Sequence, residues 1–412
     1  MKILALILAG GRGTRLDILS ENRVKPSVPF AGKYRIIDFT LSNCTNSHIY
    51  DIAILTQYLP FSLNDHIGSG KPWDLDRRDT KITLLQPHDS WYEGTADAVR
   101  KNIRYLEQVN PDIVLILSGD HIYKMDYRKM IEQHIQKDAV LTVGCNVIEP
   151  KEAFRFGMMA TDDNLRITEF IEKPKKTALT LASMGIYVFD KDVLLDQLRK
   201  NVDIEDLDFG KHIIPGMIKD NPVFAYKFYG YWKDVGTYDS YLETNLGLIE
   251  TVDKIKLDMY DPKWKIYTRS EELPAVKVGS KAVIKQALLS NGSIVAGNVE
   301  RCVLSPGVVV HPLAKVTNSI ILNDVEIKAG AIVDHCIIDK HTVIGENAMV
   351  GFGDDFTPNQ EHPELLENGI TVLGKHINVP KNMVIGRNCR IFQTAKLDEV
   401  TNNIIYSGST LR

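Results

Sequence analysis

The chain up to about residue 250 alternates short apolar runs with stretches of helical spacing. The apolar runs are typical of strands buried on both faces, and they occupy residues 3–8, 52–55, 113–117, 140–143 and 186–188. Between them, residues 96–106 and 127–136 place apolar side chains along one helix face. This alternation predicts an α/β domain with a mostly parallel sheet, in which ligands bind at the carboxyl ends of strands.

The pattern changes from about residue 276, where helical spacing disappears and β-branched residues become frequent. Apolar residues then recur every six positions, at Val283, Leu289 and Val295 and again at Val325, Ala331, Ile337, Val343 and Met349. Glycines punctuate this stretch at Gly279, Gly292, Gly307, Gly330 and Gly345. Such hexads are typical of a parallel β-helix of either hand, in which each coil stacks on the next; a β-sandwich is the alternative.

We therefore predict one domain over residues 1–250, a linker over 251–275 and a β-helical domain over 276–412. Residues 351–369 interrupt the hexads with polar side chains, which predicts a loop between coils. The hexads stop after Ile391, so we expect a capping or edge element there, because the ends of a β-helix need covering.

Composition narrows the classes of protein that need to be considered. Residues 1–9 are apolar enough to resemble a signal peptide, but no small-residue cleavage site follows, so a buried strand is favoured. No apolar run reaches the roughly 18 residues of a membrane span. A net charge of −4 gives no indication of a nucleic-acid partner. Five scattered cysteines with no C-x-x-C pair fit a cytoplasmic protein without a cysteine metal site.

A glycine-rich loop follows the first predicted strand and reads Gly10-Gly11-Arg12-Gly13-Thr14-Arg15-Leu16. Glycines let the backbone approach a ligand and direct amides at it, and two arginines suit phosphate oxygens. Leu16 stands where a dinucleotide fingerprint would need glycine, and no Gly-Lys pair is followed by Ser or Thr as in a P-loop. The loop therefore predicts a triphosphate site of another kind.

With Lys25-Pro26, this loop resembles that of the sugar nucleotidyltransferase superfamily. Further motifs narrow the resemblance to the bacterial glucose-1-phosphate adenylyltransferase (ADP-glucose pyrophosphorylase) family. They start at Tyr34 (YRIIDF), Ser42 (SNC), Leu55 (LTQY), Trp91 (WYEGTADA), Ser118 (SGDHIY), Glu172 (EKP), Ser183 (SMGIY) and Trp232 (WKDVGT). The resemblance covers the whole chain. It implies a Rossmann-like, GT-A-like nucleotidyltransferase domain followed by a left-handed β-helix that serves regulation and oligomerisation.

The resemblance also implies the chemistry. AMP would pass from ATP to α-D-glucose 1-phosphate, giving ADP-glucose and pyrophosphate for glycogen or α-glucan synthesis. Arg15, Lys25, Asp120 and Asp234 match the catalytic positions, with Asp120 and Asp234 holding Mg²⁺. Mg²⁺ prefers one or two carboxylates plus phosphate oxygens and water. Since a phosphate monoester has a second pKa of about 6, the nucleophile needs no general base.

The remaining site residues are implied in the same way. The nucleotide positions are Gly10, Gly11, Gly13, Thr14, Gln86, Tyr92, Gly94 and Thr95. The glucose 1-phosphate positions are Gly157, Glu172, Lys173, Ser183 and Gly185. Lys33 and Arg35 match an allosteric pocket for a phosphorylated metabolite, and the family implies a homo-oligomer, expected to be a tetramer. Structural alternatives stay open for these positions. Thr95 can be a helix N-cap as well as a site residue. The segments at Glu172-Lys173-Pro174 and at Lys33 to Arg35 could be solvated charged turns, and Gly157, Ser183 and Gly185 could serve turns alone.

Three other functions stay open from the sequence. The enzyme could use another nucleotide or sugar. The chain could be a non-catalytic regulatory paralogue, although such a subunit would be expected to lose the loop arginines or a metal carboxylate, and these are present. The β-helical part could carry an acetyltransferase site built on His311, His335 or His341, for which surface or core histidines are the alternative.

Overall fold

The computed structural model describes residues 1–11, 13–78, 80–87, 90–250 and 256–412. The chain divides into two units that each draw on separate stretches of sequence. The sheet unit comprises Met1–Arg12, Ile37–Trp232 and Pro262–Tyr267; the β-helix unit comprises Gly13–Ile36, Lys233–Asp261 and Thr268–Arg412. The predicted boundaries 1–250, 251–275 and 276–412 stay a prediction, and residues 251–255 lie outside the described residues.

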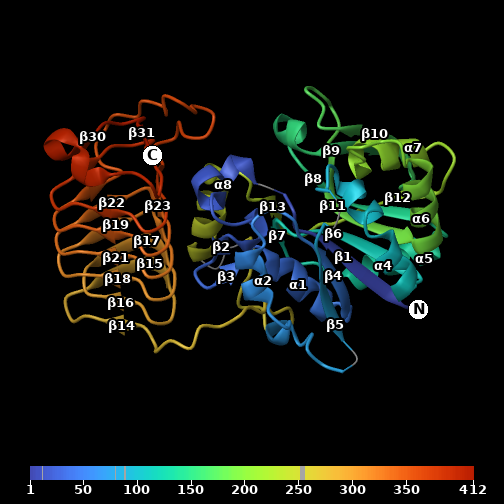
Figure 1. Cartoon of the computed structure of the whole chain (residues 1–412), viewed down its shortest axis with the longest axis horizontal. Helices are drawn as coiled ribbons and strands as arrows, with labels where there is room; N and C mark the ends of the chain where they lie inside the picture. The colour runs from blue at the N-terminus through green and yellow to red at the C-terminus, as the bar shows by residue number, and fades with distance from the viewer. Residues whose placement is uncertain (12, 79, 88–89, 251–255) are drawn as a thin grey trace. The chain divides into compact units, whose positions relative to one another are not determined.

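A mixed sheet with a parallel centre forms the sheet unit (Figure 1). Its main path runs β10-β9-β11-β6-β1-β4-β5, with β8 and β12 paired beyond β11. β1 is parallel to β4 and β6, whereas β11 is antiparallel to β6. The strands are β1 (Ile3–Leu8), β4 (Asp51–Leu55), β5 (Lys81–Leu85), β6 (Ile113–Ser118), β8 (Leu141–Val147), β9 (Gly157–Thr161), β10 (Ile167–Glu172), β11 (Leu181–Asp190) and β12 (Val223–Lys227). The predicted α/β class is confirmed.

The helices of this unit are α1 (Ile37–Asn46), α2 (Phe61–Ile67), α3 (Thr95–Arg100), α4 (Ile103–Val109), α5 (Tyr127–Gln136), α6 (Lys191–Lys200) and α7 (Ile214–Met217). α5 has its predicted bounds, but the predicted helix 96–106 is two helices. Asn102 lies between them with φ −112°, and its side-chain amide donates to the Ala98 carbonyl at 2.8 Å. An asparagine that bonds locally to the backbone competes with helix formation, which accounts for the break.

The core explains why the central strands read as unbroken apolar runs. Leu4 and Leu6 of β1, and Val114 and Ile116 of β6, are almost completely buried in one cluster with Val99 of α3. Strands covered on both faces need apolar residues at successive positions. The loops after β1 and β6 are therefore held on a rigid base at the carboxyl edge of the sheet.

Stacked coils of short parallel strands form residues 277–411 of the β-helix unit (Figure 1). One sheet runs β14 (Lys277–Val278), β16 (Ile294–Val295), β18 (Val309–Val310), β21 (Glu326–Ile327), β24 (Val343–Ile344) and β27 (Asn378–Val379). The twelve-stranded sheet contains β15 (Val283–Leu289), β17 (Asn298–Leu304), β19 (Lys315–Thr317), β20 (Ile320–Ile321), β22 (Ile332–Asp334), β23 (Cys336–Ile338), β25 (Met349–Val350), β26 (Thr371–Leu373), β28 (Val384–Ile385), β29 (Arg390–Ile391), β30 (Ile404–Ile405) and β31 (Thr410–Leu411). The predicted left-handed β-helix class is confirmed.

The coils are slightly shorter than three full hexads. Val309 pairs with Glu326 and Glu326 with Val343, so the step between coils is 17 residues. A strict six-residue count therefore loses phase with the inward positions. Val325 is fully buried as predicted, but Val283 is 48% exposed and Val343 is only half-buried.

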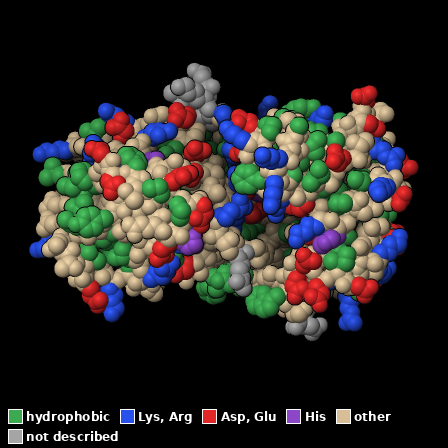
Figure 2. All heavy atoms as spheres, turned by 90° about the horizontal axis from the view of Figure 1, so that it is seen from above, with side chains coloured by type: hydrophobic (Ala, Val, Ile, Leu, Met, Phe, Trp, Pro, Cys, Tyr) green, Lys and Arg blue, Asp and Glu red, His purple; other side chains and the backbone are tan. Residues whose placement is uncertain are grey.

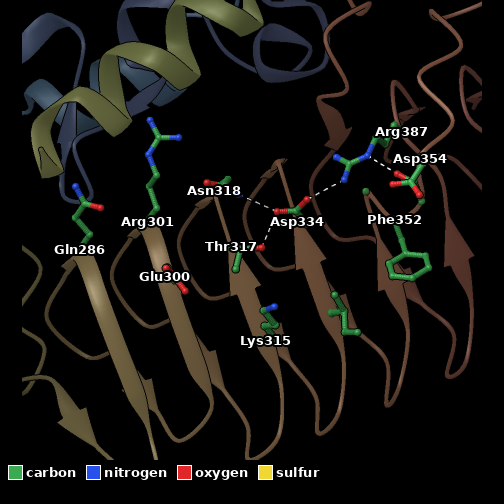
Figure 3. Close-up of a pocket in the computed structure, with 13 residues that line it drawn as sticks. Gln286, Glu300, Arg301, Lys315, Thr317, Asn318, Asp334, Phe352, Asp354 and Arg387 are labelled. Carbon is green, nitrogen blue, oxygen red and sulfur yellow. Dashed lines mark hydrogen bonds and ion pairs between the residues drawn. The ribbon is translucent and has the colours of Figure 1, made fainter.

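The polar interruption at residues 351–369 is a loop between coils, as predicted. Cys336 pairs with Thr371, a step of 35 residues where the neighbouring coils step 17. Arg387 holds the base of this loop, since its Nε donates to the Gly353 carbonyl at 2.6 Å and its Nη2 to Asp334 Oδ2 at 2.9 Å. Arg387 and Asp334 belong to a groove of about 650 Å³ along the coils (Figure 3).

The chain beyond Ile391 adds one more partial coil. β30 pairs with β28 and β31 with β29, and both are edge strands of their sheet. Two short 3₁₀ turns, η8 (Leu397–Glu399) and η9 (Thr401–Asn403), precede β30. The predicted edge element is confirmed, but it continues the stack instead of forming a separate cap.

Figure 2 shows lysine and arginine side chains interspersed with acidic ones on the face drawn, in keeping with the small net charge of −4. Within the described ranges, no helix combines the length and the apolar character that crossing a membrane requires.

Candidate active site

The boundary between the two units falls within the glycine-rich loop, and the β-helix unit begins at Gly13. Arg12 lies outside the described residues. Gly13 has φ 64° and precedes the 3₁₀ helix η1 (Thr14–Ser20). A β-carbon on Gly13 would lie 2.8 Å from the Lys25 Cβ. Only glycine satisfies both the positive φ and this close approach. The tight turn brings the loop against Lys25 of η2 (Lys25–Ser27).

Two cations of this loop meet the carboxylate of Asp234 at the end of β13 (Trp232–Asp234). Lys25 Nζ donates to Asp234 Oδ1, and both side chains are buried. Arg15 Nη2 lies 3.4 Å from Asp234 Oδ2, and Arg15 is half exposed. Two cations against one carboxylate leave an excess positive charge beside solvent. The structure thus brings together three of the four predicted catalytic residues.

Asp120, the fourth, follows β6 in the sheet unit, at a carboxyl edge as predicted. The Ser118 hydroxyl donates to Asp120 Oδ1, and His121 Nε2 lies 3.5 Å from the same oxygen. A β-carbon on Gly185, whose φ is 66°, would lie 3.3 Å from the Ser118 Cβ. The indole nitrogen of Trp232, the first residue of β13, donates to His121 Nδ1 at 3.3 Å.

Two of the predicted nucleotide residues of the sheet unit, Gly10 and Tyr92, lie against Gln57. Tyr92 donates its backbone N–H to Gln57 Oε1 at 2.6 Å, and Gln57 Nε2 donates to the Tyr92 carbonyl at 3.1 Å. A β-carbon on Gly10 would lie 3.5 Å from Gln57, whereas one on Gly11 would meet no heavy atom within 4 Å. Gln86 follows β5 and is exposed. Gly11 and Gln86 thus leave space at the edge of the sheet.

The start of α3 differs from the prediction. Gly94, not Thr95, is the N-cap, and the Thr95 hydroxyl donates to Asp208 Oδ2 at 2.8 Å. A β-carbon on Gly94 would lie 2.2 Å from the Leu207 carbonyl oxygen, so this position requires glycine. The prediction of Thr95 as N-cap is wrong, because its hydroxyl donates a hydrogen bond to the distant carboxylate of Asp208 and does not cap the helix.

The predicted sugar-phosphate residues lie in β9, β10 and β11, except Lys173, which directly follows β10. Burial raises the pKa of Glu172, and Lys173 Nζ lies 3.4 Å from Glu172 Oε1. A β-carbon on Gly157 would lie 2.7 Å from Glu172 Oε2, so glycine there admits the carboxylate. The Ser183 hydroxyl accepts from the Gly185 backbone N–H at 3.3 Å. Lys173 is exposed, which fits both the sugar-phosphate role and a solvated turn, whereas Glu172 is mostly buried, which a purely solvated turn does not explain.

Sequence reasoning missed Asp208 and did not assign a role to Gln57. Asp208 accepts from the backbone N–H groups of Gly210 and Lys211 and from Thr95, and so joins the α3 start to the residues beside Glu172. An acidic residue two positions before a glycine, in Asp208-Phe209-Gly210, was the available signal. Gln57 belongs to the LTQY motif that starts at Leu55, but its two hydrogen bonds to Tyr92 depend on the tertiary fold.

The two predicted allosteric residues lie in different surroundings of the β-helix unit. Lys33 lines a cavity of about 400 Å³ together with Tyr34, Leu248 and Leu289. Arg35 instead lies among cations near the β-helix. Burial, together with the neighbouring Arg35 and Arg23, lowers the pKa of Lys340 to about 8. Burial and the same two arginines also lower the pKa of Lys375.

The three histidines considered for a second active site have local roles. His311 Nε2 lies 2.7 Å from Glu326 Oε1, and His341 stacks on His376 with ring centroids 4.9 Å apart. His335, with φ 54°, forms the corner between β22 and β23. These contacts give the acetyltransferase hypothesis no support.

Comparison with known proteins agrees with this geometry. The family model "Nucleotidyl transferase" matches residues 4–251, and the model "GlmU-like, C-terminal hexapeptide" matches residues 274–373. A protein of Thermomicrobium roseum named glucose-1-phosphate adenylyltransferase is 49% identical, covering 99% of this chain and 97% of its own. Another of that name from Fervidobacterium nodosum is 44% identical over 99% of both chains. A third, from Acetivibrio thermocellus, is 44% identical over 94% of this chain and 92% of its own.

Proposed function

Because the chain belongs to the glucose-1-phosphate adenylyltransferase family of nucleotidyl transferases, we propose that it transfers AMP from ATP to α-D-glucose 1-phosphate. The products are ADP-glucose and pyrophosphate. The observation that carries this proposal is the meeting of Arg15 and Lys25 at Asp234 beside the glycine-rich loop. A regulatory paralogue would have lost part of this set, and nothing in the comparisons favours one.

The reaction is an in-line displacement. An oxygen of glucose 1-phosphate attacks the α-phosphorus of ATP, and the bond to the bridging oxygen of pyrophosphate breaks. The attacking oxygen is already ionised at neutral pH, so the protein's task is to position the reactants and neutralise charge. Lys25, held by Asp234, supplies a fixed positive charge, and the half-exposed Arg15 contacts the triphosphate.

Family membership implies a divalent metal, and we propose that Asp120 and Asp234 hold Mg²⁺. Carboxylate oxygens are the ligands that Mg²⁺ prefers, and the protein need supply only one or two of them. Bound there, the ion supplies Lewis-acid charge neutralisation at the reacting phosphates.

The sugar phosphate binds at the residues around Glu172. Lys173 is exposed and suits the phosphate as a compact charge, while the Glu172 carboxyl accepts from sugar hydroxyls. Gly157, Ser183 and Gly185 line the space. Tyr92, Gln86 and the Gly94-Thr95 start of α3 receive the adenine nucleotide together with the loop glycines and Thr14.

The decisive experiment measures pyrophosphate release with Mg²⁺ and glucose 1-phosphate, using ATP, UTP, dTTP, CTP and GTP in parallel. We expect release with ATP to exceed that with each other nucleotide. A preference for another nucleotide would overturn the adenine assignment but keep the mechanism. Absence of release with every nucleotide would instead support the regulatory paralogue.

The remaining assignments concern regulation, assembly and location. We propose that a phosphorylated metabolite binds at the cations around Arg35, because Arg35, Arg23, Lys340 and Lys375 outnumber the neighbouring carboxylates of Asp339, Glu21 and Glu271. Lys33 lines a separate cavity and is proposed as a second contact for such an effector. We also propose that the protein is a cytoplasmic homotetramer that serves glycogen or α-glucan synthesis, a proposal that the similarity to glucose-1-phosphate adenylyltransferases supports. Analytical ultracentrifugation with and without fructose 1,6-bisphosphate tests the assembly.

A further inference from the structure

Asp17 has a backbone conformation that needs external support. It lies inside η1, two residues after Arg15, with φ 41° and ψ −107°. A residue with a β-carbon is disfavoured at such a positive φ and keeps it only where its surroundings impose it. The position of Arg15 therefore depends on whatever holds Asp17.

Arg390 of β29 is the main support. Its Nε lies 2.7 Å and its Nη2 lies 2.6 Å from Asp17 Oδ2, across 373 residues of sequence. The Arg390 side chain is only 2% exposed and that of Asp17 18%. A charge-assisted pair this far from water is stronger and more rigid than a surface ion pair.

Tyr238 joins the same carboxylate to the Asp234 strand. Its hydroxyl donates to Asp17 Oδ2 at 3.3 Å and accepts from the Ile18 backbone N–H at 3.0 Å. Burial, together with the Asp17 carboxylate, holds the pKa of Tyr238 well above its usual range, so its hydroxyl stays a donor. Tyr238 begins α8 (Tyr238–Leu246), four residues after Asp234. Asp17, which lies in η1 with Arg15, is thus tied to the helix that follows Asp234.

Arg390 is itself positioned by the inter-coil loop at 351–369 and by the terminal coil of the β-helix. Its guanidinium lies over the Phe392 ring, 5.1 Å from the centroid. Its Nη1 lies 3.5 Å from Glu361 Oε2, which belongs to the loop at 351–369, and 3.5 Å from Thr410 Oγ1 in the last strand. The inter-coil loop and the terminal coil together fix where Arg390 points.

We propose that Arg390 is a positioning residue for ATP, acting through Asp17 to hold Arg15 where it contacts the triphosphate. The last coils of the β-helix thereby set the affinity of the nucleotide site. This inference rests on the proposed role of Arg15. It differs from a purely structural role because it affects one substrate selectively: the residues assigned to glucose 1-phosphate lie in or directly after β9, β10 and β11 of the sheet unit.

The test compares R390M with R412M by steady-state pyrophosphate release. Arg412 is the matched control, because its guanidinium also lies 5.1 Å from the Phe392 centroid and also pairs with Glu361, but no bond joins it to Asp17. We expect R390M to raise the KM for ATP about tenfold or more, with the KM for glucose 1-phosphate changed by less than about threefold. R412M should leave both unchanged.

Three further variants keep the inference falsifiable. D17N removes the negative charge from the same contact at constant volume, so it carries the test if R390M does not fold. The double variant D17N/R390M should bind ATP no worse than R390M, because both changes break one contact. R15M should raise the KM for ATP; if it does not, the proposed role of Arg15 fails. If R15M raises it and the folded R390M or D17N does not, or if the KM values of both substrates rise equally, the positioning role of Arg390 is overturned.

Discussion

Lys25 and Asp234 form a buried ion pair across 209 residues of sequence. The lysine comes from the segment after the glycine-rich loop and the carboxylate from β13. The lysine charge is therefore fixed in place before a substrate arrives. A cation held in advance costs no reorganisation during the reaction, which is the main source of electrostatic catalysis.

Replacing Lys25 tests this pair. K25M should lower kcat/KM by about 100-fold or more, because it removes a preorganised charge and leaves the Asp234 carboxylate with only Arg15. The measurement is steady-state pyrophosphate release, with circular dichroism to verify folding. K396M is the control: Lys396 is exposed and pairs with Glu399 within the terminal coil. Wild-type kcat/KM in K25M would contradict the assignment.

Asp120 should matter to turnover but not to folding. D120N keeps the volume of a partly exposed side chain and removes one proposed metal oxygen. We expect pyrophosphate release to fall by about 100-fold or more, and the Mg²⁺ concentration for half-maximal rate to rise. D112N is the control, because Asp112 lies at the opposite end of β6. Equal losses in the two variants would mean that Asp120 has no special role.

Replacing Lys173 should change the KM for glucose 1-phosphate and not the KM for ATP. Because its ammonium is assigned to the sugar phosphate, K173A should raise the KM for glucose 1-phosphate about tenfold or more and leave that for ATP nearly unchanged. K175A, an exposed lysine two residues away, serves as the control. A parallel rise of both KM values would show that Lys173 acts on the fold of the site and not on the sugar phosphate.

The effector site should depend on pH in a defined direction. The pKa of Lys340 is lowered to about 8, so the side chain is charged below that pH and neutral above it. Binding of a phosphorylated anion at Arg35 should therefore weaken as pH rises through about 8. Titration calorimetry with fructose 1,6-bisphosphate at pH 7 and pH 9 measures this. K340M should bind more weakly at pH 7 and lose the pH step, whereas K328M, at a half-buried lysine paired with Glu326, should keep it. A wild-type affinity that does not change with pH would contradict the site.

Local patterns predicted most of the architecture. β1, β6 and α5 lie where the apolar spacing predicted them. A strand buried on both faces needs a continuous apolar run, and a helix buried on one face needs apolar residues at helical spacing. Two local predictions, a single helix over 96–106 and Thr95 as N-cap, were wrong because side chains form hydrogen bonds that the apolar spacing does not reveal. The Asn102 side chain donates to the Ala98 carbonyl and interrupts the predicted helix, and the Thr95 hydroxyl donates to Asp208. The 17-residue coil shifted the hexad phase, because the pairing of neighbouring coils sets the step.

The periodicity of apolar residues was enough to predict the α/β and β-helical classes. The glycine-rich loop and the residue types of the site could be predicted from the identities of single residues. The tertiary structure alone decided which of these groups meet. That Asp17 would be held by Arg390 and Tyr238 depends on contacts across 373 and 221 residues, which follow from the stacking of the last coils against the loop and leave no local pattern. Side-chain partners at such separations are set by how the whole chain packs, not by the spacing of residues along it.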